Sequence, residues 1–139
     1  MGLTIMTKKI AAAIVNKFFQ LETDILNPDN GVNVTWANIN AAKDVWWADI
    51  PVDKFKKDIY LILNDKMKQI FYLISIKANQ IKYPYSKFRK LREGYISVEI
   101  SSSEKTKFID IKSGGSRINF YRFDIETVDY GKLLQDIEV

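Results

Sequence analysis

Residues 58–76 read DIYLILNDKMKQIFYLISI. This stretch holds two runs rich in β-branched and aromatic residues, Asp58–Leu63 and Ile70–Ile76, on either side of a mostly polar segment. Two such runs around a polar turn predict a β-hairpin. Both faces of the hairpin are apolar when side chains alternate along each strand. That pattern is typical of strands in the middle of a sheet that is covered on both sides.

The register that we expect for this hairpin has its turn centred between Lys66 and Met67, which sets Asp58 opposite Ser75. A slip of one residue would exchange the two faces of the strands, so the register decides which side chains meet. The two expected faces carry Tyr60, Ile62, Phe71 and Leu73 on one side and Ile59, Leu61, Leu63, Ile70, Tyr72, Ile74 and Ile76 on the other.

Working outward from the hairpin, apolar residues at three- and four-residue spacing predict a helix over Lys8–Leu26. A second hairpin is expected from Tyr95–Ile100 and Lys107–Lys112, and a last strand around Ile118–Phe123. We therefore expect an α+β fold. Its mostly antiparallel sheet of about five strands is built from two hairpins, with the N-terminal helix packed on it, and residues 1–139 form a single domain.

Two further stretches matter for the outcome. The segment 40–50 is compatible with either a helix or a strand. In the second hairpin, one side is polar and is expected to lie in water. That side carries Ser97, Glu99, Asp110 and Lys112.

The composition excludes several kinds of catalytic and metal-binding site. The chain has no cysteine and no histidine. It therefore has no disulfide, no thiol nucleophile, no imidazole base and no ligands of the kind that zinc prefers. Any catalysis has to use carboxylates, lysine or hydroxyl groups, or a metal held by oxygen ligands, such as Mg²⁺.

Positive charge is concentrated in one part of the chain. Between Lys66 and Arg92 there are eight Lys and Arg residues and no acid, although the formal net charge of the whole chain is only +4. The segment Lys82–Gly94, which we call the connector, interleaves cations with aromatic rings. Its candidate binding residues are Lys82, Tyr83, Tyr85, Lys87, Arg89, Lys90 and Arg92.

Cations that neutralise phosphates, together with rings that stack on unpaired bases, are the components of a nucleic-acid binding surface. The pattern thus predicts a nucleic-acid partner, either DNA or RNA. One alternative is that Tyr85 and Phe88 anchor the connector on the core while its cations are merely solvated. Another is a protein-interaction or accessory domain, of the kind found in phage or defence systems, with a basic face and no catalytic activity.

The first hairpin resembles the PD-(D/E)XK nuclease superfamily, which includes many restriction endonucleases. The resemblance lies in an acid, Asp58, set opposite Ser75-Ile76-Lys77, with a helix preceding the hairpin. It implies that Asp58 is a metal ligand together with the carbonyl of Ile76, and that Lys77 activates the attacking water. Glu22 on the first helix would add a carboxylate, and Mg²⁺ would be the cofactor.

Two positions depart from that family. Ser75 stands where the family has its second acid, and Lys57 rather than proline precedes Asp58. A serine hydroxyl is a poor ligand for magnesium, which binds anionic oxygens best. We therefore expect a domain that binds nucleic acid, with at most a weak or degenerate metal-dependent nuclease activity.

No apolar run approaches the roughly 20 residues that a membrane-spanning helix needs. We expect a cytoplasmic protein with no membrane partner.

Overall fold

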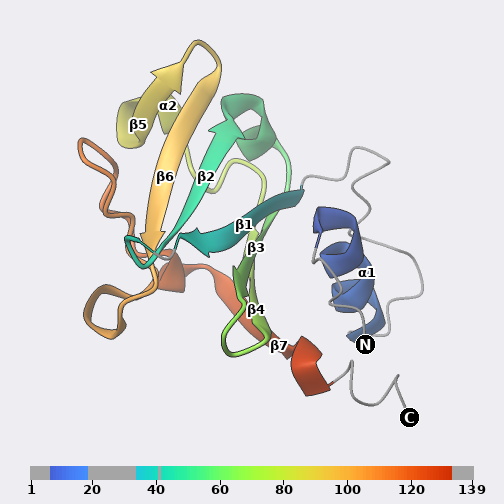
Figure 1. Cartoon of the computed structure of the whole chain (residues 1–139). Helices are drawn as coiled ribbons and strands as arrows, with labels where there is room; N and C mark the ends of the chain where they lie inside the picture. Colours follow the sequence, from blue (N-terminus) through green and yellow to red (C-terminus); the bar gives the residue numbers. More distant parts are fainter. Residues whose placement is uncertain (1–6, 19–33, 41, 133–139) are drawn as a thin grey trace.

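The structure, a computed structural model, describes residues 7–18, 34–40 and 42–132. Seven strands form one sheet in the order β5-β6-β2-β1-β3-β4-β7 (Figure 1). Along the chain they are β1 (Val34–Asn40), β2 (Val45–Pro51), β3 (Ile59–Asp65), β4 (Ile70–Ile76), β5 (Arg89–Arg92), β6 (Tyr95–Ser101) and β7 (Asp124–Asp129). The helical elements are α1 (Lys8–Phe18), α2 (Pro84–Lys87) and the 3-10 turns η2 (Val52–Lys56), η3 (Glu104–Thr106) and η4 (Phe120–Arg122).

The α+β class and the mostly antiparallel sheet are confirmed, but the sheet has seven strands where about five were expected. It is also mixed, because β1 runs parallel to β3. The first five residues of β1 pair with β3 and its last two with β2, so this strand joins the two halves of the sheet. Figure 1 shows the half that contains β2 and β6 at an angle to the half formed by β3, β4 and β7.

The hairpin β3–β4 has the predicted apolar faces, but its register is shifted by two residues from the expected one. Tyr60, not Asp58, pairs with Ser75. The shift comes from the turn, in which the side chain of Asp65 accepts a hydrogen bond from the backbone N–H of Lys68 at 3.2 Å. Gln69 completes the turn with a φ of 53°. Because side chains alternate with a period of two, a two-residue shift leaves each side chain on its expected face.

Helix α1 covers one face of the sheet. Ala11, Ala12 and Val15 are buried with residues of four strands: Val34, Ile62, Phe71, Leu73 and Val128. The hydroxyl of Thr7 accepts a hydrogen bond from the backbone N–H of Ile10 at 3.2 Å and caps the helix. The predicted helix is thus confirmed over Lys8–Phe18, and its expected continuation to Leu26 lies outside the described residues.

The opposite face holds the larger core. Leu61, Leu63 and Ile74 pack there with Trp46, whose indole N–H donates to the carbonyl of Asn64 at 2.9 Å. The stretch around Trp46, compatible with helix or strand by its pattern, is strand β2. Because the ring is almost fully buried, it adds a large apolar surface to the core, and because its N–H is hydrogen-bonded, no polar group is left unpaired.

The prediction of a second hairpin is wrong. Strand β6 exists as expected, but it pairs with β2 and β5. Residues 107–112 form only isolated bridges, such as the one between Ile100 and Asp110. Strand β2 covers one edge of β6 over its whole length. On the other edge β5 pairs with Tyr95–Ser97, so within β6 the backbone of residues 108–111 hydrogen-bonds only to Glu99 and Ser101, at the end of the strand. The last strand is also displaced: η4 takes up part of Ile118–Phe123, and the strand follows as β7.

Candidate functional site

The connector runs along one edge of the sheet, as α2 followed by the edge strand β5. Phe88 anchors it: this ring is buried and stacks on Phe55 with ring centroids 5.7 Å apart. Tyr85 is fixed at its far end, where its hydroxyl accepts a hydrogen bond from the backbone N–H of Gly94. The anchoring that we considered as an alternative therefore holds for Phe88, and it fixes the remaining side chains at the surface.

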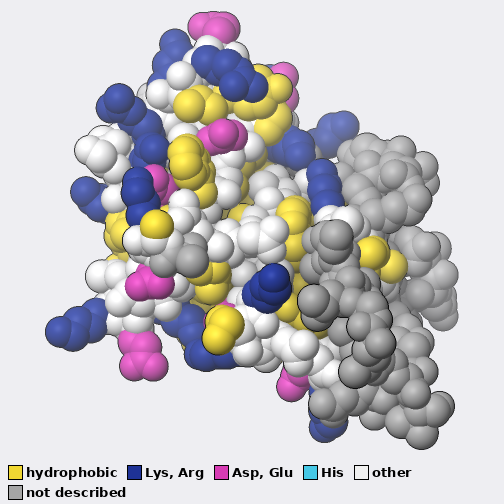
Figure 2. All heavy atoms as spheres, viewed as in Figure 1, with side chains coloured by type: hydrophobic (Ala, Val, Ile, Leu, Met, Phe, Trp, Pro, Cys, Tyr) yellow, Lys and Arg dark blue, Asp and Glu magenta, His cyan; other side chains and the backbone are white. Residues whose placement is uncertain are grey.

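The cations of the connector all point outward. Lys82, Lys87, Arg89, Lys90 and Arg92 are exposed. In the part of the chain that the structure describes, Lys90 is the one member of this set with an acid within ion-pair distance, 3.6 Å from Glu93. Such an exposed pair is worth little. Figure 2 shows Lys and Arg side chains over the upper part of the molecule, where β5 and α2 lie, with acidic side chains among them.

Aromatic rings lie against two of these cations. The ammonium of Lys90 lies 5.1 Å from the ring centroid of Tyr85, and the guanidinium of Arg92 lies 4.1 Å from that of Tyr95. Tyr83 is different: 76% of it is exposed, on a backbone in the left-handed region (φ 55°). A large ring held out in water at the end of a short helix is available to stack on a partner.

A groove lies beside these rings, between η2 and α2, with a volume of about 610 Å³. Its apolar lining comes from Val52, Phe55 and Ile81, and Tyr83 and Tyr85 form an aromatic wall. Lys82 lines it without an acidic partner in the described residues, whereas Lys56 pairs with Asp53, which also lines it, at 3.4 Å. Sequence reasoning found the tyrosines but missed the groove, because η2 comes from a distant part of the chain. Apolar residues beside tyrosine rings and Lys82 suit a flat ring attached to an anion.

The nuclease-like residues are only partly brought together. The observed register continues so that Asp58 faces Lys77 rather than Ser75, at an exposed end of the hairpin. One oxygen of the Asp58 carboxylate accepts the backbone N–H of Ala78 at 2.8 Å, which ties down the loop after β4. Glu22 lies outside the described residues.

The described ranges contain no group of three or more acids placed to hold a metal ion. Asp58 alone supplies one carboxylate that already serves the loop, so these residues do not make a good magnesium site. The expected role of Asp58 and Lys77 stays a prediction.

A second charged cluster lies where water was expected, and that expectation is wrong. Asp110 is fully buried, and Glu99 is only 7% exposed. The two oxygens of Asp110 accept four hydrogen bonds, from the backbone N–H groups of Glu99, Lys112 and Ser116 and from the Ser116 hydroxyl, at 2.7–3.2 Å. A buried carboxylate with four donors is a satisfied structural group.

The side chain of Glu99 is satisfied as well. Its Oε1 lies 3.5 Å from the ammonium groups of both Lys43 and Lys112. Lys112 in turn lies 4.9 Å from the ring centroid of Trp47. We call Asp110, Glu99, Lys43, Lys112 and Trp47 the inner cluster. It holds the 110–118 loop against β6 and leaves no carboxylate oxygen of Asp110 for a metal or a substrate.

No family model, curated protein or solved structure matches this chain. Among the described helices, none is both long and apolar enough to cross a membrane. The case for a function therefore depends on the geometry of the connector and the groove.

Proposed function

We propose that this chain binds nucleic acid through the connector, with cations on the phosphates and tyrosines against unpaired bases. The observation that carries the proposal is the contrast in pairing. Lys82, Lys87, Arg89 and Arg92 have no acidic partner within the described residues, whereas Glu99 draws two lysines to itself. Unpaired cations on one surface keep their full attraction for a polyanion.

The phosphate contacts supply most of the affinity in such a surface. Each phosphate that a Lys or Arg neutralises releases condensed counterions, so binding weakens steeply as salt rises. Arg92 is pre-positioned by its stacking on Tyr95. Holding a side chain in place before binding lowers the entropy that has to be lost on association.

The exposed tyrosines favour a single strand over a duplex. Tyr83 stands beside a groove that is lined by apolar residues and by Tyr85. A base in a duplex is already stacked on both faces, whereas an unpaired base can leave water by stacking on such a ring. The resulting mode is binding without recognition of sequence, because phosphates and ring faces are common to all bases.

Cleavage is not included in the proposal. Two-metal and one-metal nucleases need anionic oxygens around Mg²⁺, and Asp58 supplies one carboxylate that is hydrogen-bonded to Ala78. We therefore expect binding without magnesium, and no cut in the substrate when magnesium or manganese is added.

The test is a titration of labelled single- and double-stranded DNA and RNA, at low and physiological salt, with EDTA or with Mg²⁺ or Mn²⁺, followed by a gel. We expect salt-sensitive binding that is tighter for the single strand and independent of metal. A metal-dependent cut that Asp58→Ala abolishes would replace the proposal with the nuclease hypothesis. Absence of binding at low salt would refute both and direct the search to acidic protein partners.

A further inference from the structure

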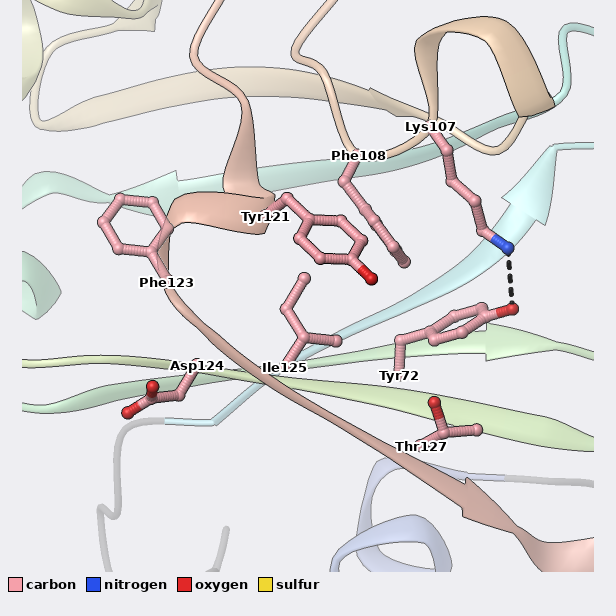
Figure 3. A pocket seen from close by; sticks show the side chains of 8 residues that line it. All are labelled: Tyr72, Lys107, Phe108, Tyr121, Phe123, Asp124, Ile125 and Thr127. Carbon is pink, nitrogen blue, oxygen red and sulfur yellow. Dashed lines mark hydrogen bonds between the residues drawn. The ribbon is translucent and has the colours of Figure 1, made fainter.

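A second pocket, of about 420 Å³, lies on the other side of the molecule's larger core, between β4, β7 and η4 (Figure 3). This volume falls within the roughly 300–1,000 Å³ that is typical of small-molecule sites. Aromatic residues make up half of its lining, and its polar groups are the Lys107 ammonium, the Asp124 carboxylate and the hydroxyls of Tyr72, Tyr121 and Thr127. The side chains that matter for the argument are Tyr72, Lys107, Phe108, Tyr121, Ile125 and Thr127.

Lys107 is the charged group of this pocket, and its position is fixed. Its ammonium donates a hydrogen bond to the Tyr72 hydroxyl at 3.0 Å. It also lies 4.8 Å from the ring centroid of Tyr72 and 5.5 Å from that of Phe108. Within the described residues no carboxylate is within ion-pair distance of this ammonium. The lysine is therefore a pre-positioned cation that contacts a hydroxyl and two ring faces rather than a carboxylate.

Tyr121 forms the outer wall. It is 67% exposed, and Figure 3 shows its hydroxyl end pointing over the space above Ile125. The turn that carries it is rigid: Phe120 is buried, and the Asn119 side chain accepts the backbone N–H of Tyr121 at 2.9 Å. An exposed ring on an anchored turn is placed to cover a ligand without first having to become ordered.

The backbone at Phe108 adds a third observation. This residue has a φ of 68°, which is unfavourable for a bulky side chain. Two hydrogen bonds hold it, from its N–H to the carbonyl of Ser101 and from the N–H of Phe120 to its own carbonyl, both at 2.8 Å. The strained backbone sets the Phe108 ring between Tyr72 and Tyr121, at centroid distances of 5.1 and 5.5 Å. Local strain that the surroundings maintain is concentrated at binding sites.

From these observations we propose that the pocket binds a small aromatic carboxylate. The flat ring of the ligand lies among Phe108, Tyr121 and Ile125, and its carboxylate accepts hydrogen bonds from the Lys107 ammonium and the neighbouring hydroxyls. A phosphate dianion would keep one charge unpaired beside a single ammonium, and desolvating an unpaired charge is costly, which favours a carboxylate. Asp124 lines the pocket too, but in Figure 3 its carboxylate points away from Lys107, toward the other end.

The test compares two probes of the same shape, indole-3-acetate and its neutral amide, indole-3-acetamide. Binding is followed by amide chemical shifts in two-dimensional NMR and by calorimetry. We expect chemical-shift changes around Phe108, Tyr121 and Ile125. We also expect about tenfold tighter binding of the acid, because the extra energy of a hydrogen bond to a charged group corresponds to about a tenfold change in the dissociation constant. A third probe, adenosine 5′-monophosphate, should bind less tightly than the acid.

Two variants remove the charge while keeping the stem that packs on the rings, Lys107→Met and Lys107→Gln. Either one should abolish the preference for the acid over the amide, whereas the matched control Lys105→Met, an exposed lysine in η3, should retain it. Tyr121→Ala should weaken the binding of both probes several-fold.

Three results would overturn the proposal: no shifts with the acid at millimolar concentration, an unchanged preference in both Lys107 variants, or tighter binding of the phosphate. Shifts confined to residues 83–92 would likewise move the site to the connector. The nucleic-acid proposal is tested separately, because none of the variants alters the connector; of these outcomes, only shifts confined to residues 83–92 bear on that surface.

Discussion

The connector and the inner cluster both place lysine beside aromatic side chains next to β6, but they differ in whether acids are present to pair with it. In the inner cluster the charges neutralise one another: Glu99 pairs with two lysines, and Asp110 is surrounded by donors. In the connector the cations face water, and Glu93, the acid that pairs with Lys90, is itself exposed. What differs is whether a charge finds its partner inside the chain, and only the charges that do not are available to another molecule.

The largest effect on stability should come from the inner cluster. Asp110→Asn replaces one acceptor oxygen by an NH₂ group among donors, and it removes the charge that strengthens the other hydrogen bonds. We expect the free energy of unfolding to fall by about 2–4 kcal/mol, measured by urea denaturation, because a buried group loses its partners. Nucleic-acid affinity of the folded fraction should stay as in the wild type. A loss below about 0.5 kcal/mol would mean that Asp110 does not hold the loop.

The next effect concerns the exposed ring of the connector. Tyr83→Asn removes the ring and keeps a residue that tolerates a positive φ. Stacking on a base is worth about 1–3 kcal/mol, so affinity for a single strand should fall roughly tenfold or more. Affinity for a duplex should be almost unchanged, which makes the duplex titration an internal control. Equal losses for both substrates would contradict the stacking role.

A smaller difference is expected between the two lysines that contact Glu99. The Lys112 side chain is 23% exposed and that of Lys43 is 59% exposed. Lys112→Met should therefore destabilise the fold by about 1 kcal/mol and Lys43→Met by a few tenths, since exposed ion pairs contribute little. Chemical denaturation of both variants under identical salt tests the order, and the reverse order would show that burial does not set the strength of these pairs.

The smallest effect is one of pH. Burial, with Asp65 nearby, raises the pKa of the Tyr130 hydroxyl above its ordinary value of 10.0, although its hydrogen bond to Asn64 acts in the other direction. A pKa raised by folding means that Tyr130 stabilises the fold fully below pH 10 and loses this contribution as pH rises through the folded value. In Tyr130→Phe the free energy of unfolding should fall less steeply with pH in that range. An identical alkaline dependence in both proteins would show that Tyr130 is not the titrating group.

How far the sequence predicts this molecule depends on whether the deciding contacts are local. The two faces of β3 and β4 follow from alternation, and the turn register was missed because a side-chain contact of Asp65 selects the shorter turn. Strand β6 was predicted, but its partner β2 lies about fifty residues earlier in the chain, and no local sequence pattern predicts that pairing. Alternation alone would put Glu99 and Asp110 in water.

The candidate site shows the same division. Charge density and the interleaved rings identified the connector, because exposure of cations is the default for lysine and arginine. The groove beside Tyr83 needs η2 from another part of the chain, and the pocket at Lys107 needs β4, β7 and η4 together. Both are products of tertiary structure, and the sequence carries no periodic signal for either.

The central claim, that the unpaired cations of the connector form the binding surface, is tested most directly by two double variants of equal net charge. One is Arg89→Glu with Arg92→Glu. The other is Lys105→Glu with Lys132→Glu, two exposed lysines in η3 and after β7. Each is titrated by fluorescence anisotropy against a labelled single-stranded oligonucleotide at several salt concentrations.

We expect the connector variant to bind at least about tenfold more weakly, with a salt slope smaller by roughly 0.7 for each phosphate that is no longer neutralised. The control variant should bind nearly as well as the wild type, because η3 and the end of β7 lie away from β5 and α2 (Figure 1) and salt screens charges that are distant from the ligand. If the two variants bind equally weakly, only the net charge matters, and the connector is not the binding surface.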